Sequence, residues 1–161
     1  VFHAEWVSDD FHARYSALCK EYRHRVPNSA VDSPFDSAYC WRIARRLDEQ
    51  AMNQAAQYAV GTHDFRAFMS TGSDMEDTVR TVYFFRVERE GEIITFHICA
   101  DGYLYNMVRI LVGTLIDVGV GRKKPEDMCA VIEGKDRSKA GDTAPAKGLF
   151  LHRVHYPEEQ E

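Results

Sequence analysis

Residues 104–119 read LYNMVRILVGTLIDVG, and this stretch decides the fold more than any other. Its apolar residues recur at intervals of three and four, which places them on one face of an α-helix. These residues are Leu104, Met107, Val108, Leu111, Val112, Leu115 and Ile116. An apolar face this broad predicts a helix that ends near Gly119 and packs against a sheet.

The segments around this helix alternate between strand and helix patterns. Residues 78–88 and 92–100 are rich in β-formers and are separated by Arg89, Glu90 and Gly91, which predicts a β-hairpin. Further strands are expected at 1–7, 15–26 and 149–156, further helices at 48–60 (N-cap Asp48, stop Gly61) and 125–132, and a surface loop at 27–39. This mixture predicts an α+β fold in one domain, residues 1–161, with a mostly antiparallel mixed sheet and helices packed on one face.

The composition fits a single soluble domain. The chain has 161 residues, and 45% of them are hydrophobic, enough to bury a substantial core. No apolar run approaches the ~20 residues of a membrane helix, and the first residues show neither a secretory nor a transit-peptide pattern. The four cysteines are widely spaced without a CxxC pair, which favours free thiols in a reducing cytoplasm, as small core residues, over disulfides or a zinc site. We therefore expect a cytoplasmic protein.

The net charge gives no overall sign of nucleic-acid binding. It is −5, from 20 Lys and Arg against 25 Asp and Glu, so any RNA site has to be local. The candidate basic residues are Arg14, Lys20, Arg23, Arg25, Arg42, Arg45, Arg46, Arg122, Lys123 and Lys124. Taken alone, short basic clusters of this kind are more often solvated faces.

Arg109 lies inside the apolar helix, and at about 100° per residue it falls at the edge of the apolar arc. Two interpretations are equally compatible with this position. The guanidinium can project into a cleft, or the stem can cover apolar surface while the charged end reaches water. A buried guanidinium without an anion costs several kcal/mol. If Arg109 is buried, we expect a carboxylate to face it.

Tyr22 and the pair Gly148 and Leu149 each allow two interpretations. Tyr22 shares a predicted strand face with Leu18 and is either a core ring with a hydrogen-bonded hydroxyl or a platform that stacks on an extruded base.

Residues 144–151 either form a turn into the last strand or build a flat pocket. In the pocket, Gly148 would allow close backbone approach and Leu149 would form the floor.

Other patterns that carry chemistry are missing from the sequence. Seven histidines include no HExxH, and His152 and His155 should point to opposite faces of a strand, so no metal site is predicted. The signatures GxGxxG, GxxxxGK(S/T) and GxSxG do not occur either. Asp64 follows a helix end, where an Asp more often closes a turn through its own side chain than acts in catalysis.

Five stretches, in this order, resemble the tRNA pseudouridine synthase A family. They are DDFHAR at 9–14, KEYR at 20–23, GTHDF at 61–65, MVRILVGTL at 107–115 and APAKGLFL at 144–151. Together they extend over nearly the whole chain. Their common order is more specific than any one of them.

The resemblance implies an isomerase that converts uridine to pseudouridine in the anticodon stem-loop of tRNA. Such enzymes are homodimers that need neither metal nor cofactor, and their fold has two similar α+β halves beside a basic RNA cleft. By resemblance, Tyr22 would stack on the target uracil, Arg109 would pair with the catalytic aspartate, and Leu149 would line the uracil pocket. Gly148 would adjoin that pocket, and the basic residues proposed to contact RNA are Arg14, Arg23 and Arg25.

The sequence departs from the family in one decisive respect. It contains no GRTDAGVH-type motif, which carries the catalytic aspartate, and no counterpart of the first half of the fold. We therefore expect a C-terminal half that is inactive alone. His24 is a second departure, at a position where the family often has another aromatic residue.

Two other functions are alternatives to a tRNA pseudouridine synthase. One is a non-catalytic RNA-binding α+β module, but the sequence has no RNP1-like run of basic, glycine and aromatic residues. The other is a small-molecule transferase, but no phosphate-binding loop is recognisable.

Overall fold

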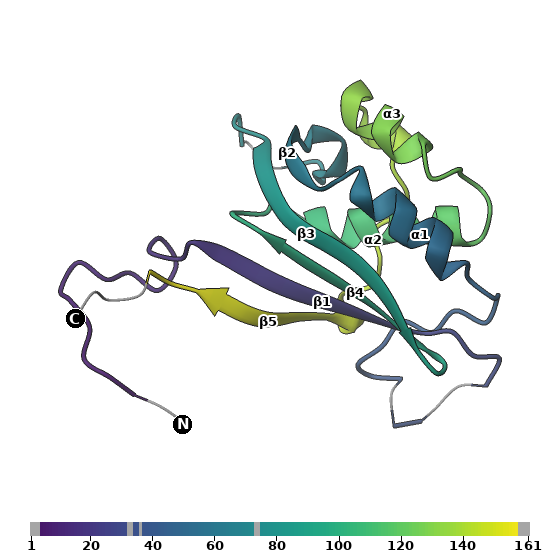
Figure 1. Ribbon diagram of the computed structural model, residues 1–161, viewed down its shortest axis with the longest axis horizontal. Coiled ribbons are helices and arrows are strands. Elements are labelled where there is room, and N and C mark those ends of the chain that lie inside the picture. The colour runs from purple at the N-terminus through teal and green to yellow at the C-terminus, as the bar shows by residue number, and fades with distance from the viewer. Residues whose placement is uncertain (1–3, 32–33, 36, 73–74, 158–161) are drawn as a thin grey trace.

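The computed structural model describes residues 4–31, 34–35, 37–72 and 75–157. The strands are β1 Cys19–Pro27, β2 Gly61–Asp64, β3 Val79–Glu90, β4 Ile93–Ala100 and β5 Leu149–His155, and the helices are α1 Glu49–Gln57, α2 Met107–Gly119 and α3 Asp127–Gly134. The strands form one sheet in the order β2-β3-β4-β1-β5, and each described pair is antiparallel (Figure 1). The predicted α+β class and antiparallel sheet are confirmed.

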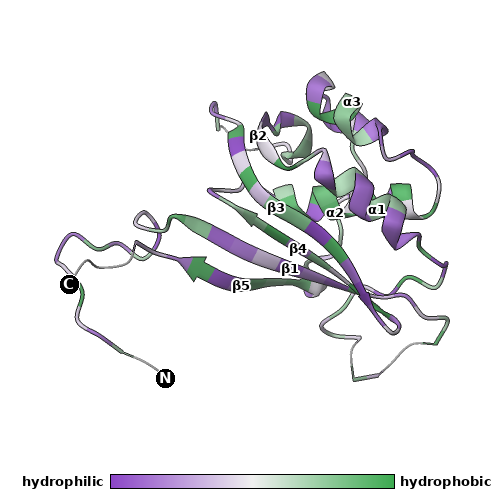
Figure 2. Ribbon diagram, viewed as in Figure 1, coloured by the Kyte–Doolittle hydropathy of each residue, from purple (hydrophilic) through white to green (hydrophobic). Residues whose placement is uncertain are grey.

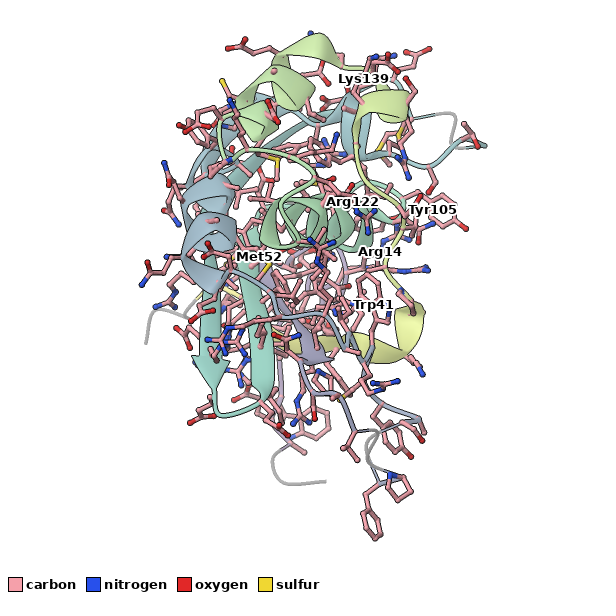
Figure 3. The ribbon with its side chains drawn as sticks, turned by 90° about the vertical axis from the view of Figure 1, so that its right-hand side faces the viewer. Arg14, Trp41, Met52, Tyr105, Arg122 and Lys139 are labelled. Carbon is pink, nitrogen blue, oxygen red and sulfur yellow. The ribbon has the colours of Figure 1, made fainter. Side chains whose placement is uncertain are left out.

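The helices cover one face of the sheet, as predicted (Figure 1). Along β4, Ile94, Phe96 and Ile98 are buried beneath α1 and α2, while the residues between them face the other side. Met52 of α1 points toward α2 and lies against Gly119 at the end of α2 (Figure 3). The core therefore lies between the sheet and these two helices. Within the described residues, no helix has the length and apolar content that crossing a bilayer requires.

Several local predictions are confirmed. The β3–β4 hairpin and α2 form where the sequence indicated, and Asp48 caps α1 by accepting a hydrogen bond from the Ala51 N–H at 3.0 Å. Two predictions are wrong. Residues 4–7 form no strand, and residues 1–3 of that predicted strand lie outside the described residues. The strand predicted from residue 15 begins only at Cys19, and Leu18 is 56% exposed.

Strand β1 is the most polar of the inner strands β3, β4 and β1, although β4 and β5 flank it on both sides (Figure 2). Its sequence is CKEYRHRVP, and the side chains of His24 and Val26 are fully buried on the helix-covered face. Arg23 and Arg25, which alternate with His24 and Val26, face the opposite side. Buried polar residues are uncommon and require specific partners. So polar an inner strand therefore indicates that some of its residues are kept for function and not for packing.

Helix α2 is in direct backbone contact with residues 141–144. A Cβ atom at Gly113 would lie 1.7 Å from the Asp142 carbonyl oxygen, and one at Gly141 would lie 2.7 Å from the Thr114 nitrogen. The Thr114 hydroxyl accepts a hydrogen bond from the Gly141 N–H at 2.8 Å. Only glycines allow two backbones to approach this closely.

We expect Gly113→Ala to destabilise the protein. Alanine is favoured over glycine inside a helix by about 1 kcal/mol, but the added methyl would overlap a backbone carbonyl that cannot rotate away. The overlap should outweigh the propensity gain and lower the free energy of unfolding by a net ~2 kcal/mol or more. Chemical denaturation measured by circular dichroism tests this.

Gly134→Ala is the matched control, since Gly134 ends α3 and no heavy atom lies within 4 Å of a Cβ placed there. This variant should be as stable as the parent or slightly more so. Equal effects of the two substitutions would contradict the close approach of α2 and residues 141–144.

Candidate active site

A pocket opens on the helix-covered side, where the start of α2 meets β1 and β5. It is lined by Tyr22, Tyr103, Leu104, Asn106, Met107, Val108, Arg109 and Leu149. The space accessible to water measures about 140 Å³, close to the size of a cavity that holds one aromatic ring. Apolar and aromatic walls with a few polar groups are typical of a ligand site.

Two aromatic rings form one wall of the pocket. Tyr22 packs edge-on against Tyr103, with 5.1 Å between ring centroids. The Tyr103 hydroxyl shares its one proton between the carbonyl oxygens of Lys20 at 2.8 Å and Ile98 at 3.2 Å, and burial raises the Tyr103 pKa. Tyr103 is therefore fixed, whereas no described residue bonds the Tyr22 hydroxyl. The Tyr22 ring, only partly buried, presents its surface to the pocket.

Arg109 reaches the pocket from the first turns of α2. Its Nε donates to the Ala144 carbonyl at 2.6 Å and its Nη1 to the Asn106 Oδ1 at 2.9 Å. The Ala144 N–H in turn donates to the Arg109 carbonyl at 3.1 Å. These bonds fix the plane of the guanidinium. None of the described residues gives Arg109 a carboxylate partner, so the anion expected from the sequence does not come from this part of the chain.

Asn106 holds the guanidinium from a strained backbone position. It precedes α2 with φ of 61°, in the left-handed region, and its side chain does not cap the helix. Instead, its Oδ1 accepts from Arg109 and its Nδ2 donates to the Ser70 hydroxyl at 3.0 Å. A non-glycine residue in this conformation is uncommon, and such strain is concentrated at functional sites.

Leu149 faces the pocket because β5 is in register with β1. His24 pairs with Leu149 and Tyr22 with Leu151, so Tyr22 and Leu149 are diagonal neighbours on one face. Gly148, just before β5, lies beneath this floor without lining it. A Cβ there would lie 2.5 Å from His24 Cε1 and 2.9 Å from the Arg25 carbonyl. The close approach predicted for Gly148 is thus a contact with β1.

His24 ties β1 to the loop before β5. Its Nε2 lies 3.1 Å from the Pro145 carbonyl oxygen, which can only accept, so Nε2 carries the proton. The pKa of His24 is lowered from 6.5 to about 4, mainly by burial; the hydrogen bond to Pro145 opposes this shift, and the positive charge of Arg109 adds to it. At neutral pH His24 is therefore a neutral residue that positions the floor of the pocket.

The structure brings together Tyr22, Arg109 and Leu149, the three residues singled out as pocket residues. It does not bring the basic residues Arg14, Arg23 and Arg25 to the pocket. Arg23 and Arg25 alternate with Tyr22 and His24 along β1 and face the helix-free side. Arg14 precedes β1, with its guanidinium 5.6 Å from the Tyr15 ring centroid.

Sequence reasoning missed Tyr103 and Asn106. Asn106 directly precedes α2 and Tyr103 lies four residues before its first residue, and a polar Asn beside that first residue was the only available signal.

None of the residues that line the pocket is acidic. Asp64, the carboxylate considered from the sequence, lies at the end of β2 and accepts hydrogen bonds from the Arg66 N–H at 3.1 Å and the Thr78 hydroxyl at 2.6 Å. Its predicted role in closing a turn is confirmed. Partial burial opposes ionisation of Asp64, but hydrogen bonds from Lys135 and Thr78 outweigh it and lower the pKa to about 2. Asp64 is thus a structural anion.

Comparisons with known proteins point to one family. A family model described as tRNA pseudouridine synthase matches residues 55–157. A tRNA pseudouridine synthase A from Thermoanaerobacter sp. (strain X514) is 46% identical over 156 residues, covering 97% of this chain and 64% of the relative. Those from Acetivibrio thermocellus and Geobacillus kaustophilus are 46% and 45% identical over 150 residues, covering 93% of this chain and 62% and 58% of the relatives.

The fold and the pocket define an α+β protein with an apolar and aromatic pocket, lined also by an arginine that has no carboxylate partner among the described residues. The chain belongs to the tRNA pseudouridine synthase A family, as the five sequence stretches indicated. It spans 58% to 64% of the length of these curated relatives.

We expect the stability of the protein to depend on His24 between pH 6.5 and pH 4. The unfolded chain binds a proton at this residue below pH 6.5, whereas the folded protein binds it only near pH 4. The contribution of His24 to the free energy of unfolding is therefore fully present above pH 6.5. It is lost as the pH falls toward 4, by about 3 kcal/mol in total. His24→Gln, which retains an N–H able to reach Pro145, should flatten the dependence of unfolding free energy on pH in this window.

The measured quantity is the slope against pH, so a general destabilisation by the substitution does not obscure it. Gln54→Ala, which removes no titratable group from an exposed position of α1, is the control and should leave the slope as it is. An unchanged slope in His24→Gln would show that folding does not lower the pKa of His24.

Proposed function

We propose that this chain supplies the uracil-binding wall of a tRNA pseudouridine synthase, in which Tyr22 and Leu149 hold the base and Arg109 orients the catalytic aspartate. The observation that carries the proposal is the convergence of these three residues, far apart in sequence, on one pocket without an acidic residue. The aspartate would come from a segment outside this chain. The family membership supports the same reading.

The isomerisation breaks the bond between N1 of uracil and C1′ of the ribose and forms a bond between C5 and C1′. C5 releases its proton to solvent and N1 takes up a proton, so substrate and product are isomers and no oxidant or reductant is needed. The aspartate attacks or deprotonates the nucleotide while the glycosidic bond breaks. The detached uracil must then turn without leaving the site, and a small pocket with apolar and aromatic walls can retain it through this step.

Arg109 is suited to hold an ionised aspartate. Two of its three nitrogens are already bound to Ala144 and Asn106, so the guanidinium is oriented before the carboxylate arrives. A fixed cation beside a carboxylate keeps its pKa low and its charged form aligned at neutral pH. In this role Arg109 is a positioning residue, because it acts on the nucleotide through the aspartate.

The tRNA would extend well beyond the pocket. Arg14 precedes β1, and Arg23 and Arg25 face away from the pocket, so any RNA contacts they make would be with parts of the tRNA remote from the target nucleotide. Arg23 is also 3.8 Å from the Glu21 carboxylate. The homodimer implied by the resemblance remains a prediction, as does a cytoplasmic location.

Tritium release from tRNA labelled at uracil C5 tests the proposed function. The chain extended upstream by the aspartate-bearing half should release tritium, and the chain alone should not. Arg109→Ala in the extended protein should reduce kcat at least ~100-fold, because the carboxylate loses its orientation. Tyr22→Ala should also reduce turnover, since the base loses its stacking surface.

Arg122→Ala is the matched control for Arg109→Ala. Arg122 follows the other end of α2, is mostly exposed and pairs with Asp117 at 2.9 Å, so its loss should leave turnover unchanged. Turnover by the chain alone would place the catalytic carboxylate within it and overturn the proposal. Full activity of the extended Arg109→Ala variant would refute the positioning role while leaving the family assignment intact.

A further inference from the structure

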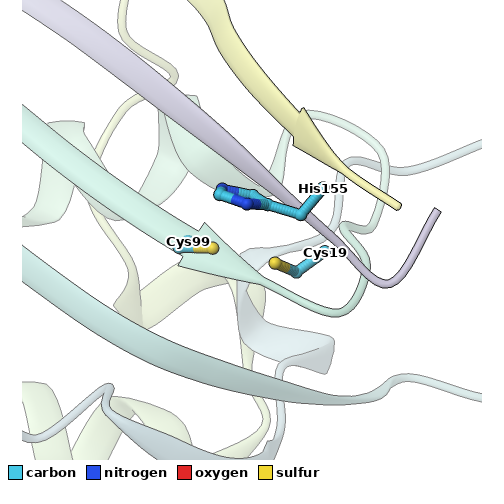
Figure 4. Close-up of side chains that lie close together, drawn as sticks. All are labelled: Cys19, Cys99 and His155. Carbon is cyan, nitrogen blue, oxygen red and sulfur yellow. The ribbon is translucent and has the colours of Figure 1, made fainter. Parts of the chain in front are cut away.

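Two thiols and an imidazole meet on the helix-free face of the sheet, away from the pocket. They belong to Cys19, Cys99 and His155, whose sulfur and nitrogen atoms all lie within 4.8 Å of one another (Figure 4). Cys99 is buried, and the other two are partly exposed. The cluster is independent of the proposed function, because it uses none of the residues that line the pocket.

The register of three neighbouring strands creates this cluster. Cys19 of β1 pairs directly with His155 of β5, and Cys99 of β4 pairs with Glu21, two residues further along β1. All these side chains point to the same face, because pairs opposite each other share a face and residues two apart along a strand do too. The residues are far apart in sequence, and the strand order β4-β1-β5 brings them together.

We propose that Cys19, Cys99 and His155 bind a zinc ion. Thiolates and a neutral imidazole are the preferred ligands of Zn²⁺, whereas an oxygen-seeking ion such as Mg²⁺ or Ca²⁺ would find no suitable donors among the three. Tetrahedral bonds of about 2.0–2.3 Å separate ligand atoms by roughly 3.5–3.8 Å. Small side-chain rotations therefore suffice to close the cluster around the ion.

The charge balance of the site favours a divalent ion. When Zn²⁺ binds, each thiol releases its proton to solvent as its zinc–sulfur bond forms, and two thiolates neutralise the ion. A neutral complex costs less at a partly buried position than an isolated charge would. Without a metal, burial and a hydrogen bond to Cys19 raise the pKa of the Cys99 thiol to about 12, so zinc has to displace that proton.

The surroundings leave one coordination position for water and supply a nearby anion. Glu21, directly opposite Cys99, adds a negative charge that affects the Cys99 thiol. Its carboxylate lies 3.8 Å from Arg23 and 3.9 Å from His152. Among the described residues, the ring nitrogens of His155 have no hydrogen-bond partner, so its imidazole is available to the ion.

Bound zinc would fasten the edge strand β5 to the inner strands. His155 is the last residue of β5, Cys19 is the first residue of β1, and the Leu18 N–H already donates to the His155 carbonyl at 2.8 Å. A metal here would link residues 136 positions apart, from 19 to 155. The ion therefore has a structural role in this proposal and takes no part in the isomerisation.

Zinc titration of the reduced chain against a chromophoric chelator tests the proposal. We expect about one Zn²⁺ per chain, a raised melting temperature, and, with Co²⁺ in its place, the visible and charge-transfer bands of a tetrahedral thiolate site. Cys19→Ser and His155→Ala should each abolish stoichiometric uptake. Glu21→Gln should weaken it about tenfold without abolishing it.

Cys129→Ser and His152→Ala are the matched controls, since each removes a residue of the same type outside the cluster and should leave zinc uptake unchanged. Circular dichroism verifies that every variant folds. Two results would overturn the proposal: no uptake by the folded, reduced parent chain, or uptake that survives both Cys19→Ser and His155→Ala. Formation of a Cys19–Cys99 disulfide by a chain that binds no zinc would identify a redox pair instead.

Discussion

The pocket depends on the backbone contact between α2 and residues 141–144. Gly113 and Gly141 let the two segments touch, and the Thr114 hydroxyl joins them by a hydrogen bond to the Gly141 N–H. One turn earlier on α2, Arg109 and Ala144 exchange hydrogen bonds in both directions. The same contact therefore orients the guanidinium and directs the chain toward β5. The packing of α2 and the geometry of the pocket therefore depend on the same backbone atoms.

The side chains of β1 alternate between the two faces of the sheet, and each face carries a different cluster of polar and aromatic residues. Tyr22 and His24 face the helices, where Tyr22 lines the pocket and His24 holds the loop before its floor. Cys19 and Glu21 face the other way and take part in the thiol–imidazole cluster or its surroundings. An inner strand that serves both faces cannot be uniformly apolar, which accounts for its polar sequence.

The sequence predicted the elements whose periodicity is strong and missed what only tertiary contacts create. The spacing of α2 and the hairpin signal around Gly91 identified the core, and the helical arc placed Arg109 at its edge. Strand β2 has only four residues, too few for alternation to be visible. The left-handed backbone of Asn106 has no local signature. Nor could spacing reveal the cluster of Cys19 and His155, because it depends on the order of the strands.

No carboxylate among the described residues balances the charge of Arg109 at the pocket. The guanidinium is half-buried, and its described partners are oxygens without a full negative charge. Such an arrangement sacrifices stability, since a partly desolvated cation gains more from a carboxylate than from neutral dipoles. A pocket selected for stability alone would bury an apolar residue at this position. This chain has an oriented guanidinium at this position and not an apolar side chain. That choice is the strongest physical reason to expect a carboxylate opposite Arg109.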